Sequence, residues 1–456
     1  MAVYTGSFLR RLLPLLAAGG LLAGCAAAYA RVNVSEKDYR AAAREHPAYL
    51  GGMVRDLLEE GRRNEVLNWN RMALRALRRG DREVAKRYFD GSIREINRVF
   101  SNSERAKKAR SLWFREEIKD FKGDPYERAM VFFYRGLLYY MDGELDNARA
   151  AFRSGQIQDA FAEEAQNRSD FAVFDYLDAR VTQRIDSPED AVQAFARARS
   201  LRRRLSAPGA EENVLLVATL NRGPAKYTAP GRRHELLYHR GPERLKSILI
   251  LKDGLLLGAA VRAGDLNYQA TTRGGREFAS ILNGKVQFKK TTDTLGTGAL
   301  ATGVILSRAA AMERDSNRRG ALAVGSLAAL AVGGTLKAIS ALTRTEADTR
   351  TWTALPGQIY LWSGKLPPGE HELEFRYYWR DVWKPAASSA GGAWEEAGRM
   401  LADLDKFGRS SQRVRRMLRS IGASEERDSR RRVTVRVEPG KKDHLVFVPS
   451  PNAHEG

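Results

Sequence analysis

Residues 35 to 206 carry apolar side chains at the three- and four-residue spacing of amphipathic helices. Alanine, leucine, arginine and glutamate dominate this stretch, and prolines are few. The spacing puts the apolar side chains of each helix on one face, which must pack against a neighbouring element. We therefore predict an α-helical domain over residues 35–206.

One stretch of this helical half has small and aromatic residues at fixed offsets. The pattern consists of an aromatic residue, a glycine, a second aromatic residue, an alanine and a phenylalanine, at Phe132, Gly136, Tyr139, Ala148 and Phe152. It resembles the tetratricopeptide repeat, a pair of antiparallel helices. The small residues of such a pair let the two helices approach closely. We predict that these five residues pack one helix against the next.

Two further stretches match the same offsets less completely. The first match consists of Trp69, Ala73, Ala76, Ala85 and Phe89. The last match consists of Ala179, Ala191 and Phe195. The spacing between the matches is uneven, so additional helices must lie between them. Because such repeats contact mainly their neighbours, we also expect the helical half to fold without the rest of the chain.

Stacked helix pairs of this kind leave a concave surface, which can bind a peptide or a helix of another protein. The alternative is that these helices only brace the rest of the chain. Five arginines crowd the first repeat-like stretch, and we treat them as candidate partner-binding residues: Arg71, Arg75, Arg78, Arg79 and Arg82.

The pattern changes to that of strands after residue 212. Residues 214–220 form a continuous aliphatic run, and Asp253 and Gly254 separate two apolar runs in the manner of a β-hairpin. In residues 372–379, apolar and polar side chains alternate as in a half-buried strand. Together with the runs at 432–437 and 444–448, these patterns predict an antiparallel β-sandwich-like domain over residues 213–450. The predicted fold class is α+β.

Two helical insertions interrupt the predicted β domain, at about residues 270–345 and 390–423. The first contains a glycine- and alanine-rich helical hairpin, residues 294–342. We expect this hairpin to be buried in the domain, and the alternative is that it inserts into a membrane or self-associates. The second insertion is a basic amphipathic helix, which either packs over the sheet or lies on an anionic membrane.

Cys25 is the only cysteine among 456 residues, and it follows an uncharged apolar stretch from Leu12 to Gly24. Arg10 and Arg11 precede the stretch, which is shorter than the roughly 20 residues of a membrane-spanning helix. This charge order and length are typical of a secretory signal. Residues 22–25 resemble the lipobox of bacterial lipoproteins. The resemblance implies that residues 1–24 are removed and that acyl chains such as palmitate are attached to Cys25.

The alternative is an ordinary signal peptide with a chance cysteine near its end. In the lipoprotein interpretation, residues 25–34 form a lipidated tether. Several buried acyl chains hold a protein on a membrane far more durably than one chain does. Ala26 follows the cysteine, whereas inner-membrane lipoproteins often carry aspartate there, so we expect an outer-membrane location facing the periplasm.

The formal charge of +21 falls to +19 when Arg10 and Arg11 leave with the signal peptide. Such a basic surface favours anionic partners. In the periplasm these are an acidic protein, peptidoglycan or lipopolysaccharide, and the compartment argues against nucleic acid. At 43% hydrophobic and 29% charged residues, the composition is that of a globular protein.

The order of these features resembles an uncharacterised family of tetratricopeptide-repeat-containing lipoproteins of Gram-negative bacteria. Residues 126–152 and 347–361 carry the resemblance best. It implies a cell-envelope location and a two-part architecture, and it supplies no catalytic residue.

Motifs of common enzymes are missing: the chain has no HExxH, GxSxG or GxxxxGK[ST] sequence. Six scattered histidines suggest no metal site. We predict a non-enzymatic adaptor or scaffold without cofactor or metal. The main alternative is a component of an envelope transport or pore assembly that uses residues 294–342, and a hydrolase on the β half is a third possibility.

Overall fold

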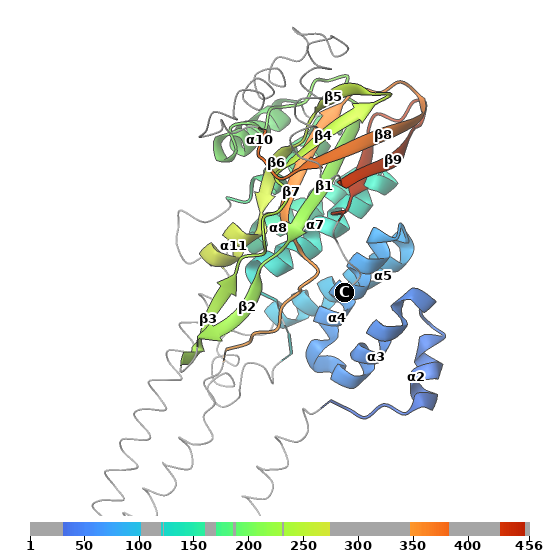
Figure 1. The fold of residues 1–456 in the computed structure, drawn as a ribbon, viewed down its shortest axis with the longest axis vertical. Helices are drawn as coiled ribbons and strands as arrows, with labels where there is room; N and C mark the ends of the chain where they lie inside the picture. The colour runs from blue at the N-terminus through green and yellow to red at the C-terminus, as the bar shows by residue number, and fades with distance from the viewer. Residues whose placement is uncertain are drawn as a thin grey trace, which may run out of the picture.

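The computed structural model of the chain describes residues 31–101, 120–121, 123–159, 170–185, 188–229, 232–273, 347–382 and 429–451 (Figure 1). Our predictions for Cys25, for the hairpin 294–342 and for the insertion 390–423 lie outside these residues. Within them the chain contains helices together with one mixed and two antiparallel sheets, which confirms the α+β class.

The described helices before residue 206 pack largely as consecutive pairs. The close pairs are α4 with α5, α7 with α8 and α9 with α10, and α8 also packs on α9. The bounds are α2 Glu36–Ala43, η1 Ala48–Leu50, α3 Gly51–Glu60, η2 Gly61–Asn64, α4 Glu65–Arg78, α5 Arg82–Ser101, α7 Pro125–Asp142, α8 Leu145–Asp159, α9 Ala172–Arg184 and α10 Pro188–Leu201. One more helix, α11 Leu266–Arg273, follows the first strands.

Local sequence fixes both ends of the central helix α7. Asp124 and Glu127 form a capping box, in which each side chain accepts a hydrogen bond from the other residue's backbone N–H. Pro125 occupies the first turn, where its missing N–H costs nothing. Gly143 ends the helix with φ of 82°, in the left-handed region that glycine adopts readily.

Within the described residues, ten strands form three sheets. Their bounds are β1 Val214–Arg222, β2 Ala225–Ala229, β3 Arg232–His239, β4 Ser247–Lys252, β5 Leu255–Ala259, β6 Val261–Asp265, β7 Pro356–Gly364, β8 Gly369–Tyr378, β9 Ser429–Val437 and β10 His444–Val448. The order β10-β1-β7-β6 makes up the mixed sheet. The order β5-β4-β8-β9 makes up the antiparallel sheet, and β2 and β3 form a separate hairpin.

The prediction of antiparallel strands throughout is wrong at β10. This strand pairs in parallel with β1, from Val214 opposite His444 to Ala218 opposite Val448. A parallel pair needs a long connection between its strands. Here the connection includes all of the antiparallel sheet, so the last strand returns to the mixed sheet from the other layer.

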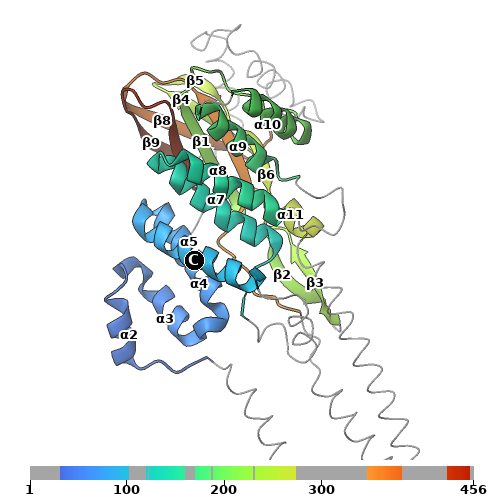
Figure 2. The same cartoon turned by 180° about the vertical axis from the view of Figure 1, so that it is seen from behind.

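The mixed sheet lies between two layers (Figures 1 and 2). Figure 2 shows α7, α8 and α9 across one of its faces, and the antiparallel sheet packs on the other. Because side chains alternate along a strand, Leu215 and Val217 of β1 join the core with the helices. Val214 and Leu216 join the core between the two sheets instead.

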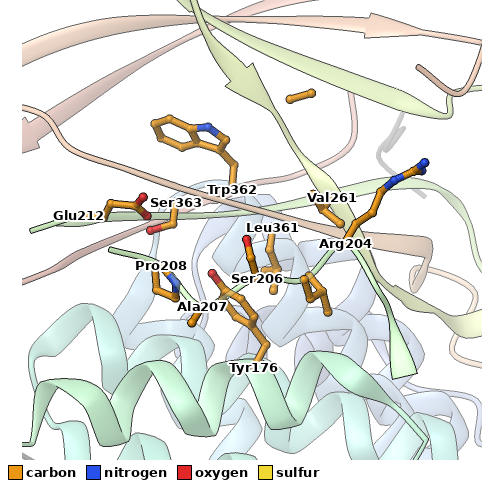
Figure 3. A pocket seen from close by; sticks show the side chains of 12 residues that line it. Tyr176, Arg204, Ser206, Ala207, Pro208, Glu212, Val261, Leu361, Trp362 and Ser363 are labelled. Carbon is orange, nitrogen blue, oxygen red and sulfur yellow. The ribbon is translucent and has the colours of Figure 1, made fainter. Parts of the chain in front are cut away.

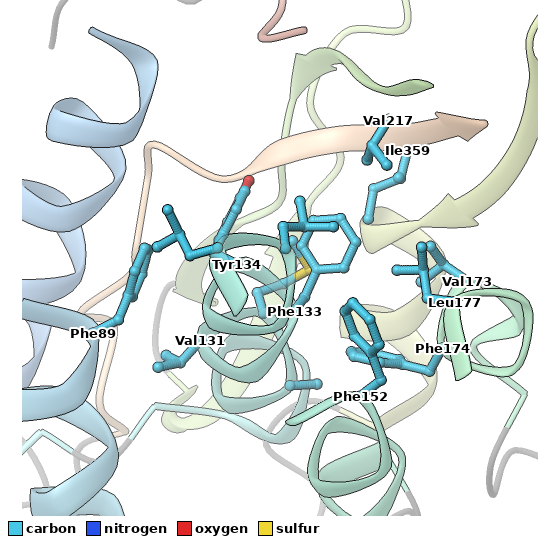
Figure 4. Packing of buried hydrophobic residues seen from close by; sticks show 14 of the residues in the cluster. Phe89, Val131, Phe133, Tyr134, Phe152, Val173, Phe174, Leu177, Val217 and Ile359 are labelled. Atoms are coloured by element: carbon cyan, nitrogen blue, oxygen red, sulfur yellow. The ribbon is translucent and has the colours of Figure 1, made fainter. Parts of the chain in front are cut away.

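A single hydrophobic core joins the helical half to the mixed sheet. Phe133, Phe152 and Phe174 of the helices lie in the same cluster as Val217 and Ile359 of the sheet (Figure 4). The helices therefore contact more than their own neighbours. This removes the basis for expecting the helical half to fold alone.

Other strand predictions are confirmed. Asp253 and Gly254 connect β4 to β5 with φ of 51° and 73°, the left-handed pair that a tight hairpin turn requires. In β8, Leu373 and Phe375 are fully buried, as the alternating pattern predicts. Trp379 was part of that pattern, but it lies just beyond β8 and its side chain is half exposed.

Candidate functional site

The residues predicted to pack the helix pairs are nearly all buried. A Cβ atom on Gly136 of α7 would overlap the ring of Phe152 of α8, so the glycine allows this ring to rest on the helix backbone. Half-buried members are Trp69 and Tyr139, and fully or almost fully buried members are Ala73, Ala76, Ala85, Phe89, Phe132, Ala148, Phe152, Ala179, Ala191 and Phe195.

Two of the five candidate partner-binding arginines contact the segment that precedes β7. Arg71 Nη2 donates to the carbonyl of Thr351 at 3.3 Å. Arg78 Nη2 donates to the carbonyl of Ala354 at 2.6 Å, and burial lowers the pKa of Arg78. Both arginines extend from α4 and hold the irregular segment that precedes β7.

Of the other three candidates, Arg75 is half-buried, and Arg79 and Arg82 are exposed. Arg75 Nε donates to the carbonyl of Tyr49, and the guanidinium of Arg79 lies 5.1 Å from the centre of the Tyr49 ring. Arg82 is 3.7 Å from Asp142 at the end of α7. Arg71 and Arg78 thus contact the segment before β7, whereas Arg75, Arg79 and Arg82 lie beside Tyr49 or Asp142. The helical spacing alone does not distinguish these two groups.

Residues 347–355 form an irregular segment with a turn at 353–354, which packs against α4, α5 and α7. We call it the docked segment. Trp352 at its centre is completely buried, with its ring 6.3 Å from that of Phe89 and 6.0 Å from that of Tyr134. Its backbone N–H donates to Glu127 Oε1 at 2.8 Å. The helices therefore hold this irregular segment by an aromatic anchor and by hydrogen bonds to its backbone.

A buried lysine fixes the docked segment against α7. Lys226 of β2 lies 2.6 Å from Glu127 Oε2 and 2.9 Å from Asp124 Oδ2, the two residues of the capping box. Burial opposes its charge, but the two carboxylates outweigh this effect and raise the pKa of Lys226. The backbone N–H of Lys226 donates to Thr351 Oγ1 at 3.1 Å. Lys226, Asp124 and Glu127 all have partners within the protein, so we assign this cluster a structural role: it joins β2 and the docked segment to α7.

A second buried ionic cluster joins the start of β10 to the helices. Asp443 accepts hydrogen bonds from Arg180 and Arg184 of α9 and from the Tyr140 hydroxyl of α7. Burial alone would raise the pKa of Asp443, but Arg180 and the other donors lower it below the ordinary value. Arg184 also donates to the backbone carbonyl of Glu212.

A cavity of about 170 Å³ lies between α9, the linker from α10 to β1, and the mixed sheet (Figure 3). Figure 3 shows the hydroxyls of Tyr176, Ser206 and Ser363 around this space. Sequence analysis missed this cavity, because its walls come from four separate stretches of the chain. The one available signal was the position of residues 204–208, at the junction of the helical and strand patterns.

Within the described ranges, no cluster of three histidine, cysteine, aspartate or glutamate side chains could hold a metal ion. In the same ranges, no helix combines the length and the apolar character that a membrane span requires. No protein-family model, curated protein or solved structure matches the chain.

Proposed function

We propose that this chain is a cell-envelope lipoprotein that acts as a non-enzymatic adaptor or scaffold. The lipobox-like residues 22–25 support anchoring through acyl chains on Cys25. Ala26 favours the outer membrane, with the folded part facing the periplasm. This proposal agrees with the resemblance to tetratricopeptide-repeat-containing lipoproteins of Gram-negative bacteria.

The observation that carries the adaptor function is the way the helices hold the docked segment. They bind nine residues of irregular chain with one buried aromatic anchor, Trp352, and with arginine donors to the carbonyls of Thr351 and Ala354. Helical grooves recognise partner peptides by the same means. We propose that the paired helices are tetratricopeptide-like, that the two larger sheets form a sandwich-like module, and that the whole presents binding surfaces for other proteins.

The basic surface of the first repeat-like stretch favours an acidic protein segment as the partner. Arg79 and Arg82 of the first repeat-like stretch are exposed, and the mature chain carries a formal charge of +19. Charge of this kind steers the encounter of two proteins more than it strengthens the final complex. Peptidoglycan and lipopolysaccharide offer similar anionic groups in the same compartment.

The experiment compares the wild-type chain with the Cys25→Ser variant in a Gram-negative host. We expect the wild type to incorporate a palmitate analogue, and the variant to lose the label and the detergent-resistant membrane association. Cross-linking in intact cells followed by mass spectrometry should then recover a defined envelope protein. Unchanged labelling of Cys25→Ser would refute the anchor. Carbonate-resistant membrane retention of that variant would instead favour the transport or pore function of residues 294–342.

A further inference from the structure

The strand β7 is longer than its neighbour β6 in the mixed sheet. On one side β1 pairs with β7 as far as Gly364. On the other side β6 pairs only as far as Leu361, which lies opposite Val261. No described strand continues the pairing beside residues 362–364 on the β6 side.

The reason is the path of the chain before Val261. If β6 extended backward in the same sheet, Gly258 and Ala259 would run beside the end of β7. Instead they pair with Ile250 and Leu249 of β4 in the antiparallel sheet. The chain therefore changes sheets at Ala260 and leaves one edge of β7 open over three residues.

The cavity of about 170 Å³ lies at this open edge. Its walls include Ala259 at the end of β5, Val261 at the start of β6, and Trp362 and Ser363 of β7 (Figure 3). Ser363 Oγ is buried and has no hydrogen-bond partner among the described residues. A buried hydroxyl without a partner is unfavourable, so a ligand that supplies the missing hydrogen bond gains affinity there.

Trp362 makes the wall of the cavity on the side of the antiparallel sheet. A Cβ atom on Gly364 would overlap its indole ring, and one on Gly258 would lie 2.7 Å from its Nε1. The ring is thus held between two glycines of different strands. The shape of the open edge is therefore set by packing and is already formed without a ligand.

The linker beside the cavity has more basic than acidic residues. The linker that forms one wall contains three consecutive arginines at positions 202–204, and Arg203 and Arg204 are exposed. Of the two acidic residues that follow in the same linker, Glu211 is paired with Lys365 at 2.7 Å. The other, Glu212, lines the cavity itself. The three arginines outnumber these two glutamates along the linker, so its net charge is positive and favours an acidic ligand.

We propose that an extended, acidic segment of a partner protein adds to the mixed sheet beside residues 362–364 and inserts a hydroxyl or amide side chain into the cavity. Strand addition gives affinity through backbone hydrogen bonds, and a pocket for one side chain gives specificity. The proposal rests on the adaptor function and assigns it a surface distinct from the helices that hold the docked segment.

The test uses the full chain with Cys25→Ser and a fluorescent peptide of alternating glutamate and threonine. Two matched peptides carry lysine in place of glutamate, or proline in place of every second residue. We expect saturable binding of the acidic peptide below about 1 mM, the weak end of peptide affinities. We expect neither matched peptide to bind, and we expect slower hydrogen exchange at residues 362–364 only with the acidic peptide.

Two variants locate the site. Ser206→Trp fills the mouth of the cavity from an exposed position, and Arg203→Glu with Arg204→Glu reverses the net charge of the linker. Each should weaken binding at least about tenfold, or 1.4 kcal/mol. Ala210→Trp, exposed in the same linker but outside the cavity, should bind like the parent. Equal binding of the acidic and lysine peptides, absence of binding, or an unaffected Ser206→Trp variant would overturn the proposal.

Cross-linking in cells separates this proposal from the adaptor function itself. A photoreactive residue at position 206 should capture the envelope partner, and Arg203→Glu with Arg204→Glu should abolish the capture. If the partner is captured from other positions and not from 206, the adaptor function stands and the strand-addition site is wrong. If the acidic peptide binds as expected but no protein is captured anywhere, the site is right and the adaptor function is wrong.

Discussion

Arg180 and Asp443, which are 263 residues apart in the sequence, form a buried bidentate ion pair. Arg180 Nε lies 2.6 Å from Asp443 Oδ2, and Arg180 Nη2 lies 3.0 Å from Oδ1. Both side chains are almost completely buried. The pair fixes the beginning of the last strand to the third helix pair, so it connects the helical half to the far end of the chain.

Replacing Asp443 by asparagine should destabilise the protein by about 3 kcal/mol. The change keeps the shape of the side chain, but it leaves the charge of Arg180 buried without its counter-charge. Urea denaturation of the two proteins at neutral pH measures this difference. As a control, Glu211→Gln breaks the exposed pair with Lys365 and should leave stability almost unchanged, because solvent screens such pairs.

The same variant should alter the dependence of stability on pH. The pKa of Asp443 in the folded chain is below its ordinary value of 3.8, so the folded state binds the proton more weakly than the unfolded state. The stabilisation is therefore complete above that value and is lost as pH falls toward the lower, folded pKa. The stability difference between wild type and Asp443→Asn should shrink below about pH 4. A constant difference down to pH 3 would contradict the assigned shift.

Gly136→Leu should destabilise the contact between α7 and α8 by at least about 1–3 kcal/mol, because the new side chain must displace the Phe152 ring from a filled core. Gly52→Leu is the matched control, since a Cβ atom on this exposed helical glycine meets nothing within 4 Å. It should be neutral or slightly stabilising, as leucine favours helices more than glycine does. Thermal melting followed by circular dichroism distinguishes the two. Equal melting of both variants would show that the close approach at Gly136 is not required.

Trp352→Ala should cost about 3–5 kcal/mol of folding free energy, the typical loss for a buried aromatic residue. It removes the ring that packs on Phe89 and Tyr134. Trp352→Phe should cost much less, because the indole Nε1 is buried without a hydrogen-bond partner. For comparison, Trp379→Ala changes a half-exposed tryptophan and should cost less than about 1 kcal/mol. A small effect of Trp352→Ala would mean that the docked segment is only loosely bound.

Arg78→Ala should reduce stability more than Arg82→Ala does. Arg78 is largely buried and donates to the carbonyl of Ala354, so its loss leaves a backbone acceptor without this partner at a cost of about 1–3 kcal/mol. Arg82 is half exposed and only 3.7 Å from Asp142, a pair worth at most about 1 kcal/mol. Chemical denaturation measures both. The converse order would show that Arg78 does not hold the docked segment.

A fragment of residues 35–206 should not unfold cooperatively like the full chain. It lacks Trp352, Val217 and Ile359, which lie in the same core as the helices. Loss of these contacts exposes the apolar faces of α5, α7 and α9. We expect helical circular dichroism with a broad melting transition and binding of a hydrophobic dye. A sharp transition would show instead that the helical half folds independently.

The sequence by itself determined the local elements of this protein. Helices and strands follow from the period of apolar positions, and the turn at Asp253 and Gly254 follows from the backbone freedom of those two residue types. The close approach at Gly136 was also predictable, because only a small residue at that offset lets Phe152 rest on the helix. Each of these features depends on residues that are close together in the chain.

Only the tertiary structure decided which distant elements meet. The arginines of α4 have the same helical spacing whether they face water or the carbonyls of Thr351 and Ala354, more than 270 residues away. Nothing in residues 444–448 indicates that β10 pairs in parallel with β1, since the alternation of side chains is the same in either direction. The open edge of β7 exists because the chain changes sheets at Ala260. These contacts are selected by the packing of whole layers, so no local pattern of residues records them.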